Sequence, residues 1–594
     1  AQARRRGEAQ AVGFAGGSWS YAQLLGYGQA VAAGIATAAG AGGGRVGLLL
    51  GHDEWMVAGL LGAVLSGRSY VPLDAYAPEA RNRQVLADAG VVAVVTDRAR
   101  CERAPWLEGC ALPLIVVDEV IGGIADAVRW QLPPVAPDAE AYLLYTSGTT
   151  GAPKGVVQSH RHVLGQVGLW SRSLGLVESD RLSLFAGYGY DAAVQDLFGA
   201  LLTGASVHLY DLRGAESAPE LIDRIAAERV SVLHFTPTVY RHLFGGRVTC
   251  TQDVSAVRLV VLGGERARRS DLELFKLRFR RGARLVNGLG LTESTMGLQF
   301  CADHDTPVTG EGLPVGEAVA GLEAWLLDED GERSEGAWRG ELALVGEYLT
   351  PGYHGDAELT RRRLRRLPDG RVLLRTGDLV RRLPGGELLH EGRCDRQVKI
   401  RGIRIEPAEV EAALGDLLPG VECAVIARAD AAGESTLVAY LAETGGGALV
   451  AEAELRAGLR ARLPEYLVPS ACVRLEALPR RANGKLDEAA LPAPRAVAAG
   501  TTLPRGESER RLCEIWSGLL GRESVGVDDD FFALGGHSLL ATRLIARVRD
   551  AFAVELPLLA LFENPTVAGM AEALERTARR TLSPGLPALR RRVR

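Results

Sequence analysis

Short β-branched runs alternate with longer amphipathic stretches between about residues 20 and 400. Runs such as VGLLL, VVAVVTD, SVLHF and LVVLGG are separated by segments such as ESAPELIDRIAAERV, in which apolar residues recur with helical spacing. Buried strands that alternate with amphipathic helices are typical of parallel sheets covered by helices. The pattern therefore predicts a large N-terminal α/β domain.

Two smaller units follow this domain. After GRCDRQVKIRG, the strand-like segments VECAVIARAD and STLVAYLAE and the helical segment VAEAELRAGLRARL predict a small α+β domain. PAPRAVAAGTTLP has the composition of an extended linker. Beyond it, ERRLCEIWSGLL, HSLLATRLIARVRDAF and TVAGMAEALERT predict a small all-α bundle. We expect domains at 1–394, 395–491 and 505–578, with a linker at 492–504 and a frayed tail at 579–594.

Composition narrows the function classes. The net charge is only −5 with both signs mixed, so no basic stripe for nucleic acid is present. The longest apolar run, 56–65, is too short to span a bilayer and predicts a buried helix. The leading segment lacks the basic, apolar and small-residue order of a signal peptide, so we expect a cytoplasmic protein. Because the first residue is Ala1 and not a methionine, we expect the sequence to be an excised piece. The eight cysteines lack C-x-x-C spacing and are interpreted as reduced packing residues.

Lysine is rare in this chain. Only four of the 68 basic residues are lysines, at positions 154, 276, 399 and 485. Where arginine dominates to this extent, lysine persists best where a compact ammonium group is needed. Lys276 lies in a charged helical stretch and is interpreted as an incidental survivor, whereas the other three fall in glycine-rich segments. These three are candidates for chemistry.

Residues 145–155, YTSGTTGAPKG, are flexible and rich in hydrogen-bond donors. Glycines let successive backbone N–H groups converge on an anion, and the hydroxyl groups add donors. Lys154 adds a movable positive charge. The segment does not satisfy the Walker pattern, and the alternative interpretation is a polar surface loop. We interpret it as a phosphate-binding loop.

This loop is one of a series of motifs that resembles the adenylate-forming superfamily. In order, the motifs are WSYAQL, LSGRSYVPLD, YTSGTTGAPKG, NGLGLTEST, GEL, RTGDL, GRCDRQVKIRGIRIEPAEVE, LPEYLVP and NGKLD, which span about residues 19–487. They are most similar to the adenylation domain of nonribosomal peptide synthetases. DDFFALGGHSLLA then resembles their four-helix peptidyl carrier domain.

The resemblance implies an ATP-dependent ligase that forms an aminoacyl-AMP, releases pyrophosphate and then loads a carrier. Lys485 would be catalytic, together with Lys154. Glu293 would bind Mg²⁺, which prefers hard oxygen donors, and Asp378, helped by Arg393, would hold the ribose, unless Asp378 only forms a turn. The remaining implied ATP/AMP contacts are Thr146, Ser147, Gly148, Thr149, Thr150, Gly151, Asn287 and Thr292.

A second step of the implied reaction needs the same space as the first. In the family, the small domain swings about a hinge, matched here by Asp395, so that the loop with Lys399 and Gly402 replaces Lys485. Ser538 in GGHSLL matches the attachment site of the 4′-phosphopantetheine arm, although a serine at a helix start also fits an N-cap. The arm supplies the thiol for loading.

The substrate pocket follows from the same resemblance. Asp191 matches the residue that pairs with the α-ammonium group, and a buried carboxylate needs such a partner; its other interpretation is a helix cap. Gln195 and His234 offer hydrogen bonds, which predicts a mid-sized or polar substrate side chain, although His234 also fits a structural histidine. The other expected pocket residues are Ala192, Val261, Gly263, Gly288, Met296 and Gly297.

The chain departs from the family pattern at the adenine site. Leu289 stands where an aromatic residue usually stacks, so apolar contact survives and π-stacking does not; His390 is a candidate to compensate.

Two alternative functions stay open, an aryl or acyl acid ligase that loads the same carrier and a carrier or docking module with a degenerate adenylation half. Implied partners are a phosphopantetheinyl transferase, a downstream condensation, tailoring or release enzyme and a small activator protein.

Overall fold

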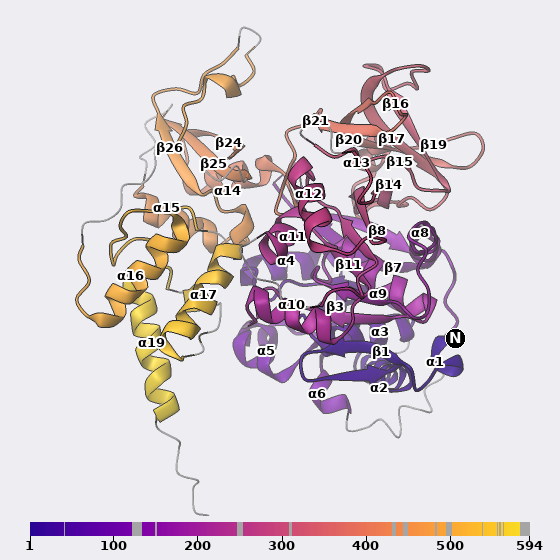
Figure 1. The fold of residues 1–594 in the computed structure, drawn as a ribbon, viewed down its shortest axis with the longest axis horizontal. Helices are drawn as coiled ribbons and strands as arrows, with labels where there is room; N and C mark the ends of the chain where they lie inside the picture. Colours follow the sequence, from indigo (N-terminus) through magenta and orange to yellow (C-terminus); the bar gives the residue numbers. More distant parts are fainter. Residues whose placement is uncertain are drawn as a thin grey trace, which may run out of the picture.

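The structure is a computed structural model of the 594-residue chain. The residues described below are all except 41, 122–132, 149–150, 215, 246–252, 308–309, 311, 430–434, 444–449, 482–483, 495–501, 537, 555, 557–559, 562–563 and 583–594. The chain forms a large N-terminal domain, a small domain and a C-terminal group of helices (Figure 1).

Two large sheets form the centre of the N-terminal domain. Seven described strands make the first, in the order β18 (Gly352–Tyr353), β8 (Lys154–Ser159), β7 (Glu140–Thr146), β4 (Ser69–Pro72), β3 (Arg45–Leu49), β5 (Val91–Thr96) and β6 (Leu114–Val116). Nine make the second, in the order β15 (Glu317–Ala318), β14 (Thr295–Ala302), β13 (Arg284–Leu291), β12 (Leu259–Leu262), β11 (Val232–Phe235), β9 (Arg181–Leu184), β10 (Ser206–Leu209), β1 (Gln10–Phe14) and β2 (Gly17–Ser20). The central strands of both sheets run parallel, as predicted.

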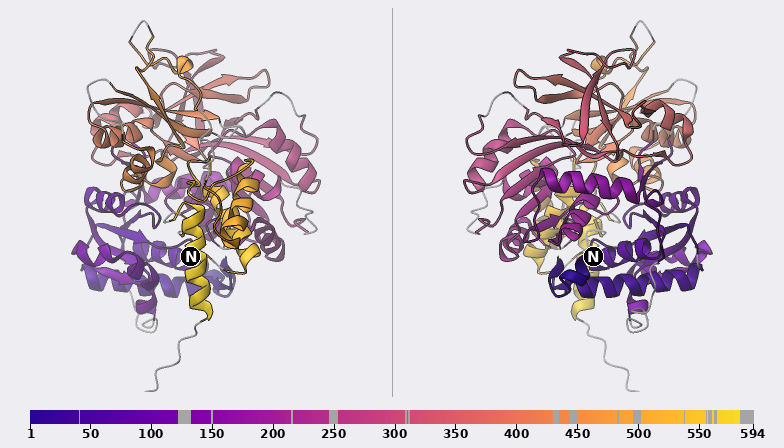
Figure 2. Two further views of the ribbon diagram at one scale, coloured as in Figure 1. Left: turned by 90° about the vertical axis from the view of Figure 1, so that its left-hand side faces the viewer. Right: turned by 90° about the vertical axis from the view of Figure 1, so that its right-hand side faces the viewer.

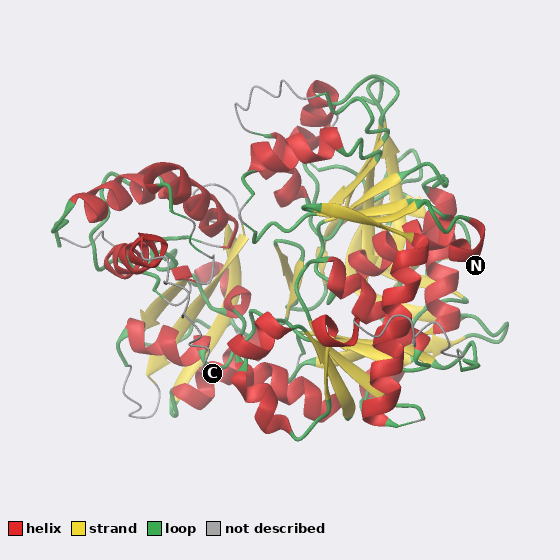
Figure 3. Cartoon of the chain, turned by 90° about the horizontal axis from the view of Figure 1, so that it is seen from below, coloured by secondary structure: helices red, strands yellow, loops and turns green. Residues whose placement is uncertain are grey.

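Four helices share one hydrophobic core with both sheets, and Figure 3 shows helices of the large domain lying between two groups of strands. They are α2 (Tyr21–Ala39), α3 (Glu54–Leu65), α8 (His160–Ser173) and α9 (Asp191–Thr203). Buried Val46 and Tyr142 of the first sheet and Val207 and Val261 of the second belong to this core. α3 is the buried helix predicted from the apolar run, and no described helix is long and apolar enough to cross a membrane.

Other helices flank the sheets. α11 starts where Thr236 accepts a hydrogen bond from the backbone of Val239 and a proline follows the cap, a favourable N-terminus. The bounds of the flanking helices are α1 (Gln2–Arg5), α4 (Glu79–Ala89), α5 (Arg98–Arg103), η1 (Pro105–Cys110), α6 (Val117–Val120), α10 (Ala218–Ala227), α11 (Pro237–Phe244), α12 (Arg269–Arg278) and α13 (Ala357–Arg363).

A third, antiparallel sheet completes the large domain. Its strands are β16 (Leu322–Leu327), β17 (Arg339–Gly346), β20 (Val372–Arg382), β19 (Leu364–Arg366) and β21 (Leu388–Arg393). Leu289 and Leu291 of β13 pack with Leu298, Leu342 and Leu344 in the core of this sheet. Val380 of β20 and Leu388 of β21 belong to the same core, so the third sheet packs against the C-terminal part of β13.

The small domain begins with a two-stranded hairpin and continues as an α+β unit. Its described elements are β22 (Val398–Ile400), β23 (Ile403–Ile405), α14 (Pro407–Leu417), β24 (Val421–Ala429), β25 (Ser435–Glu443), α15 (Glu452–Arg460), η3 (Glu465–Leu467), β26 (Ala471–Leu475) and η4 (Glu488–Ala490). Ile405, Val410, Leu414, Leu459 and Leu467 form its core. The hairpin is therefore anchored to this domain.

The C-terminal domain contains α16 (Glu507–Leu520), α17 (Ser538–Phe552) and α19 (Val567–Leu582) among its described residues. Its helices lie against one side of the rest of the molecule (Figure 2). Arg460 of the small domain pairs with Asp530 at 3.2 Å. Nε of Arg543 on α17 donates to Nδ1 of His242 on α11 at 2.8 Å. The C-terminal domain thus contacts both other domains, and α19 continues past residue 578.

We predict that Trp516→Ala unfolds the C-terminal domain selectively. Trp516 is fully buried, packs edge-on against Phe531 at 5.1 Å and belongs to a core separate from the other domains. Truncating a buried tryptophan costs about 3–5 kcal/mol, a large part of a small domain's stability. Hydrogen exchange should accelerate in α16, α17 and α19 and stay unchanged in the large sheets. The matched control is Trp338→Ala, because Trp338 is 64% exposed. Equal acceleration in all domains would contradict the separation.

We also predict that acid releases the C-terminal domain. Burial, together with the positive charge of Arg543, lowers the pKa of His242 from its ordinary 6.5 to about 4. Docking therefore favours neutral His242; it is fully stabilised above about pH 6.5 and weakens as the pH falls toward 4. Small-angle scattering should show a larger radius of gyration at pH 4.5 than at pH 7. His242→Asn keeps an acceptor that does not titrate, so equal expansion of this variant would refute the role of His242.

Candidate active site

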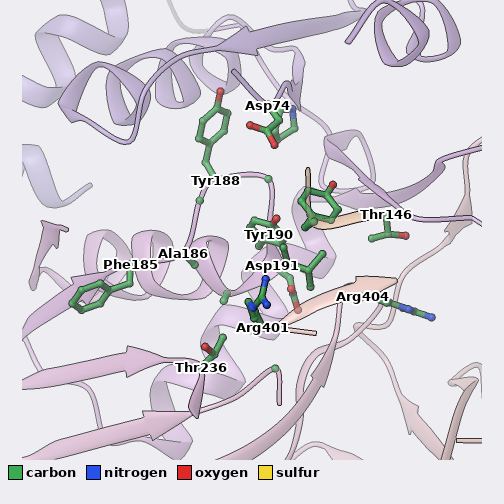
Figure 4. Close-up of a pocket in the computed structure, with 18 of the residues that line it drawn as sticks. Asp74, Thr146, Phe185, Ala186, Tyr188, Tyr190, Asp191, Thr236, Arg401 and Arg404 are labelled. Atoms are coloured by element: carbon green, nitrogen blue, oxygen red, sulfur yellow. The ribbon is translucent and has the colours of Figure 1, made fainter. Parts of the chain in front are cut away.

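A cavity of about 470 Å³ lies where the large domain meets the 398–405 hairpin. Figure 4 shows Thr146, Asp191, Thr236 and Arg401 around it. Strand ends and the start of α9 supply one wall, and the hairpin supplies another. The predicted site residues that line it are Thr146, Ser147, Asp191, Ala192, Gln195, His234, Gly263, Gly288, Thr292, Met296, Lys399 and Gly402.

The predicted phosphate loop connects β7 to β8, and Thr146 and Lys154 are cross-strand partners at its base. A side chain at Gly148 would place its Cβ 1.8 Å from the carbonyl oxygen of Ala152, so the loop closes only with glycine there. Oγ1 of Thr146 is buried and has no hydrogen-bond partner among the described residues. A hydroxyl in that state is available to a ligand. Thr149 and Thr150 lie outside the described residues.

Arg404 of the hairpin and Glu406, which follows the hairpin, bind two side chains of this loop. Oγ of Ser147 donates to the carbonyl oxygen of Arg404 at 2.7 Å and accepts from the backbone N–H of Glu406 at 3.0 Å. Nζ of Lys154 lies 3.2 Å from Oε1 of Glu406. Burial, reinforced by the nearby charge of Arg404, lowers the pKa of Lys154 to about 8. Lys154 is therefore an ammonium at neutral pH that is already paired.

Glu293 is the most strongly engaged carboxylate of the site. It is buried, with Arg404 Nη1 at 2.7 Å from Oε2 and the Tyr353 hydroxyl donating to Oε1 at 2.6 Å. Burial opposes its ionisation, but the charges of Arg404 and Lys154 outweigh burial and lower its pKa to about 2. An ionised oxygen donor fits one ligand of a nucleotide-bound Mg²⁺. Among the described residues, no group of three or more histidine, cysteine or acidic side chains could hold a metal by itself.

Asp378 has one carboxylate oxygen bound and one available. Oδ1 accepts from Arg393 Nη1 at 2.7 Å and from His390 Nε2 at 3.1 Å, whereas buried Oδ2 has no hydrogen-bond partner in the part of the chain that the structure describes. Burial alone would raise its pKa, but His390 and Arg393 hold the pKa well below its usual range. An ionised oxygen in that state fits a ribose hydroxyl. Arg393 also binds Asp395, the predicted hinge residue, at 2.7 Å.

The structure also places Leu289, the departure at the expected adenine site, and His390, the candidate to compensate for it. Leu289 packs in the core of the third sheet, and its neighbour Leu291 lines the cavity. His390 is hydrogen-bonded to Asp378 at 3.1 Å and so helps to position that carboxylate. Asn287 donates its amide to the carbonyl oxygen of Pro314 at 2.7 Å. A direct contact of Asn287 with the nucleotide stays a prediction.

Lys399 reaches into the cavity from the hairpin. Its Nζ donates to the carbonyl oxygen of Gly290 at 3.1 Å, and burial lowers its pKa although Asp378 opposes that effect. Gly402, at the turn, has φ +77°, and a Cβ there would lie 2.5 Å from Thr236 Cγ2. Only glycine allows this backbone conformation and this close approach.

Lys485 lies elsewhere. It occupies an exposed turn of the small domain, where its carbonyl oxygen accepts from the backbone N–H of Arg481 at 2.8 Å. The resemblance places these two lysines alternately at the reaction centre. In the structure Lys399 lines the main cavity, and Lys485 is not among the described residues that line it. The roles of both lysines stay predictions.

Ser538 is the first residue of α17, as predicted from the sequence. Gly535 and Gly536, which precede it, line a second small cavity with Phe532 and residues of the small domain. Ile400, Arg401 and Tyr466 line both cavities. Two hairpin residues and Tyr466 of η3 thus line the main cavity on one side and the cavity next to Gly535 and Gly536 on the other.

The substrate side of the cavity is more compact than predicted. Asp191, the first residue of α9, is partly buried, and its removal from water raises its pKa although Lys399 opposes the effect. Val261 belongs to the central core, and a Cβ at Gly297 would lie 2.5 Å from Leu344. Among the described residues that line the cavity, neither Val261 nor Gly297 occurs, so their contact with substrate stays a prediction.

Four residues of the site were missed by the sequence reasoning: Arg404, Glu406, Tyr353 and Asp196. Arg404 and Glu406 lie within the quoted motif GRCDRQVKIRGIRIEPAEVE, and their charges in an apolar alternation were an available signal. Tyr353 comes from a short edge strand far along the chain. Asp196 directly follows Gln195 and is hydrogen-bonded to His234.

Family models match most of the chain. Residues 1–354 match the AMP-binding enzyme model, residues 409–485 the AMP-binding enzyme C-terminal domain and residues 510–574 the phosphopantetheine attachment site. These matches lie inside the three predicted domains, whose boundaries stay predictions.

Two curated relatives are similar over most of the chain. Surfactin synthase subunit 3 of Bacillus subtilis (strain 168) is 32% identical over 574 residues, which cover 96% of the chain and 44% of that protein. Tyrocidine synthase 3 of Brevibacillus parabrevis is 33% identical over 549 residues, which cover 90% of the chain and 8% of that protein. The chain therefore spans less than half of these relatives.

Two solved structures share the fold. Holo-PA1221, described as an NRPS protein containing adenylation and PCP domains bound to a vinylsulfonamide inhibitor, has a TM-score of 0.78 and 28% identity, covering 97% of this chain and 95% of that one. Holo-AB3403, a four-domain nonribosomal peptide synthetase bound to AMP and glycine, has a TM-score of 0.58 and 29% identity, covering 97% and 42%.

These matches confirm the predicted architecture, an α/β adenylation domain with a small C-terminal subdomain and a helical carrier domain. They also confirm the predicted reaction, activation of an amino acid with ATP and its loading as a thioester on a phosphopantetheine-bearing carrier. The chain belongs to the AMP-binding enzyme family as an ATP-dependent adenylating ligase joined to a carrier domain.

Proposed function

We propose that this chain activates an α-amino acid in the main cavity and loads it on an arm attached to its own Ser538. The observation that carries the proposal is one continuous arrangement: Asp191 and Lys399, both partly buried, line the cavity, and hairpin residues Ile400 and Arg401 line both this cavity and the small cavity before Ser538. Attached phosphopantetheine supplies the thiol, and Mg²⁺ neutralises phosphate charge during adenylation.

Adenylation uses residues that the hairpin covers in this structure. Thr146, Ser147 and Lys154 bind phosphate oxygens, Glu293 is the metal ligand, and the available Oδ2 of Asp378 accepts from the ribose. Arg404 and Glu406 must withdraw first, because they occupy Glu293, Ser147 and Lys154. Rotation of the small domain about Asp395 would remove both and bring Lys485 to the carboxylate that attacks ATP.

Loading uses the arrangement seen here. The α-ammonium of the adenylate pairs with Asp191, while Lys399 and the turn at Gly402 form the opposite wall. A thiol on the attached arm would lose its proton to solvent as its sulfur bonds to the acyl carbon, and the bond from that carbon to the phosphate oxygen of AMP would break, releasing AMP. Asp191 supports an amino acid rather than an aryl or acyl acid, because a carboxylate that is drawn out of bulk water at a cavity wall needs a cation.

The partners follow from the carrier domain. A phosphopantetheinyl transferase must modify Ser538, and a condensation, tailoring or release enzyme must accept the loaded amino acid. A small activator protein and a cytoplasmic location stay predictions from the sequence.

Intact mass spectrometry tests the proposal. The phosphopantetheinylated chain, given ATP, Mg²⁺ and a mixture of amino acids, should gain the mass of one aminoacyl group. Ser538→Ala should gain none, and Lys485→Ala should gain it at least about 100-fold more slowly, because charge stabilisation in the transition state is lost. Gain with aryl or acyl acids alone would establish the alternative ligase. Modification of Ser538 without loading by any acid would establish a carrier with a degenerate adenylation half.

We further predict that Gly402→Ala separates the two steps. The new Cβ meets Thr236 and the residue must keep a left-handed conformation, so the hairpin cannot seat in the cavity. Loading should slow about 10- to 100-fold, whereas pyrophosphate exchange, which reports adenylation, should change less than about twofold. Gly370→Ala is the matched control, with φ +88° and open space around the new Cβ. Loss of exchange in Gly402→Ala would show that the hairpin serves adenylation as well.

A further inference from the structure

A second polar group lies in the main cavity, apart from Asp191. It consists of Gln195 and Asp196 on α9 and His234 on β11, all of which line the cavity and are at most 6% exposed. Gln195 is four residues after Asp191, so the two lie about one helical turn apart on the same face. An amino acid bound to Asp191 by its α-ammonium group would direct its side chain toward this second group.

Two atoms of the group, Nε2 of Gln195 and Oδ2 of Asp196, are buried and find no hydrogen-bond partner within the described parts of the chain. Leaving a buried donor or acceptor unsatisfied costs about 1–3 kcal/mol each, so native proteins seldom do so without a reason. One atom is a donor and the other an acceptor. A ligand that satisfies both must carry an acceptor and a donor close together.

The group is also balanced in charge. Nδ1 of His234 lies 2.8 Å from Oδ1 of Asp196. Burial raises the pKa of Asp196. Burial also works against the charged form of His234, but the charge of Asp196 outweighs it and raises the pKa of His234. With one proton shared between them, Asp196 and His234 together carry no net charge. A carboxylate or ammonium side chain would add an uncompensated buried charge, which is costly, so the pair favours an uncharged side chain.

The shape of the cavity agrees with a flat, short polar group. A Cβ at Gly288 would lie 2.0 Å from Sδ of Met296, so Met296 fills the space over that glycine. A Cβ at Gly263 would lie 3.7 Å from Nε2 of His234, so the glycine leaves the imidazole edge accessible. The open side of the pocket thus leads to His234 and its partner Asp196.

From these contacts we infer that the amino acid activated here has a carboxamide side chain, whose carbonyl oxygen accepts from Gln195 and whose amide nitrogen donates to Asp196. The inference rests on the proposed function. His234 is a positioning residue that holds Asp196, and Asp196 is a specificity-determining residue. A carboxamide carries both a donor and an acceptor, so it also matches the reversed orientation of the Gln195 amide.

The first test is pyrophosphate exchange by the full chain with ATP, Mg²⁺ and single amino acids in isosteric sets. Glutamine is compared with glutamate and methionine, and asparagine with aspartate and leucine. One carboxamide should exceed both of its isosteres in kcat/KM by at least about 100-fold, because sites built to hydrogen-bond a substrate reject analogues that lack the group. Preference for an acid or an aliphatic isostere would overturn the inference but leave the proposed function intact. No exchange with any amino acid would overturn both.

The second test is Asp196→Asn, which keeps the shape but can present an amide donor where the wild type has an acceptor. Selectivity for the carboxamide over its acid isostere should fall at least about tenfold, through a changed KM for the amino acid, while the KM for ATP stays constant. Asp271→Asn is the matched control, because Asp271 is equally buried but pairs with Arg241 outside the cavity. Unchanged selectivity in Asp196→Asn, or an equal change in both variants, would overturn the role of Asp196.

Discussion

Arg404 and Glu293 form a buried ion pair that joins the small domain to the nucleotide side of the large domain. Removing two charges from water is expensive, and such a pair is stable only when hydrogen bonds satisfy the remaining atoms. Here Tyr353 donates to the same carboxylate, and Gln397 accepts from Nε of Arg404 at 2.6 Å. The neighbouring pair of Lys154 and Glu406 completes a site whose charges are balanced without a nucleotide.

This balance has a consequence for the reaction sequence. With Arg404 and Lys154 beside it, the pKa of Glu293 is about 2 and its carboxylate is ionised. Because burial opposes ionisation, another cation must replace Arg404 when Arg404 withdraws. Arg404 and a nucleotide-bound metal ion are both suitable, but they cannot both occupy the same oxygens. Likewise, Lys154 binds either Glu406 or a phosphate group. Binding of Arg404 and Glu406 therefore excludes binding of the metal ion and the phosphate groups. Departure of pyrophosphate would leave Glu293 and Lys154 without these partners, and Arg404 and Glu406 of the small domain can neutralise both.

Elements that follow from a local sequence pattern could be predicted. Contacts between segments that are far apart in the chain could not. The α/β alternation predicted the large sheets, the apolar run at 56–65 predicted α3, and the start of α17 at Ser538 was predicted from GGHSLL. In contrast, Tyr353 meets Glu293 through an edge strand that is paired to β8. Val261 and Gly297 were assigned to the pocket from the family resemblance. Val261 packs in the central core and a Cβ at Gly297 would meet Leu344, so their contact with substrate stays a prediction.

The rarity of lysine acquires a physical explanation from these contacts. Lys154 is buried and Lys399 is partly buried at the interface between the domains, and the pKa of each is lowered by its removal from water. An arginine would keep its charge and its fork of donors in such a place, whereas a lysine is a compact charge on a flexible stem that can exchange one partner for another. Lys485 lies in an exposed turn, from which the proposed rotation would carry it to the reaction centre. Where a cation instead holds both oxygens of one carboxylate, as Arg404 holds Glu293, the chain uses arginine. Three of the four lysines, all except Lys276, thus fit a site in which the lysines are the cations that must change partners between steps.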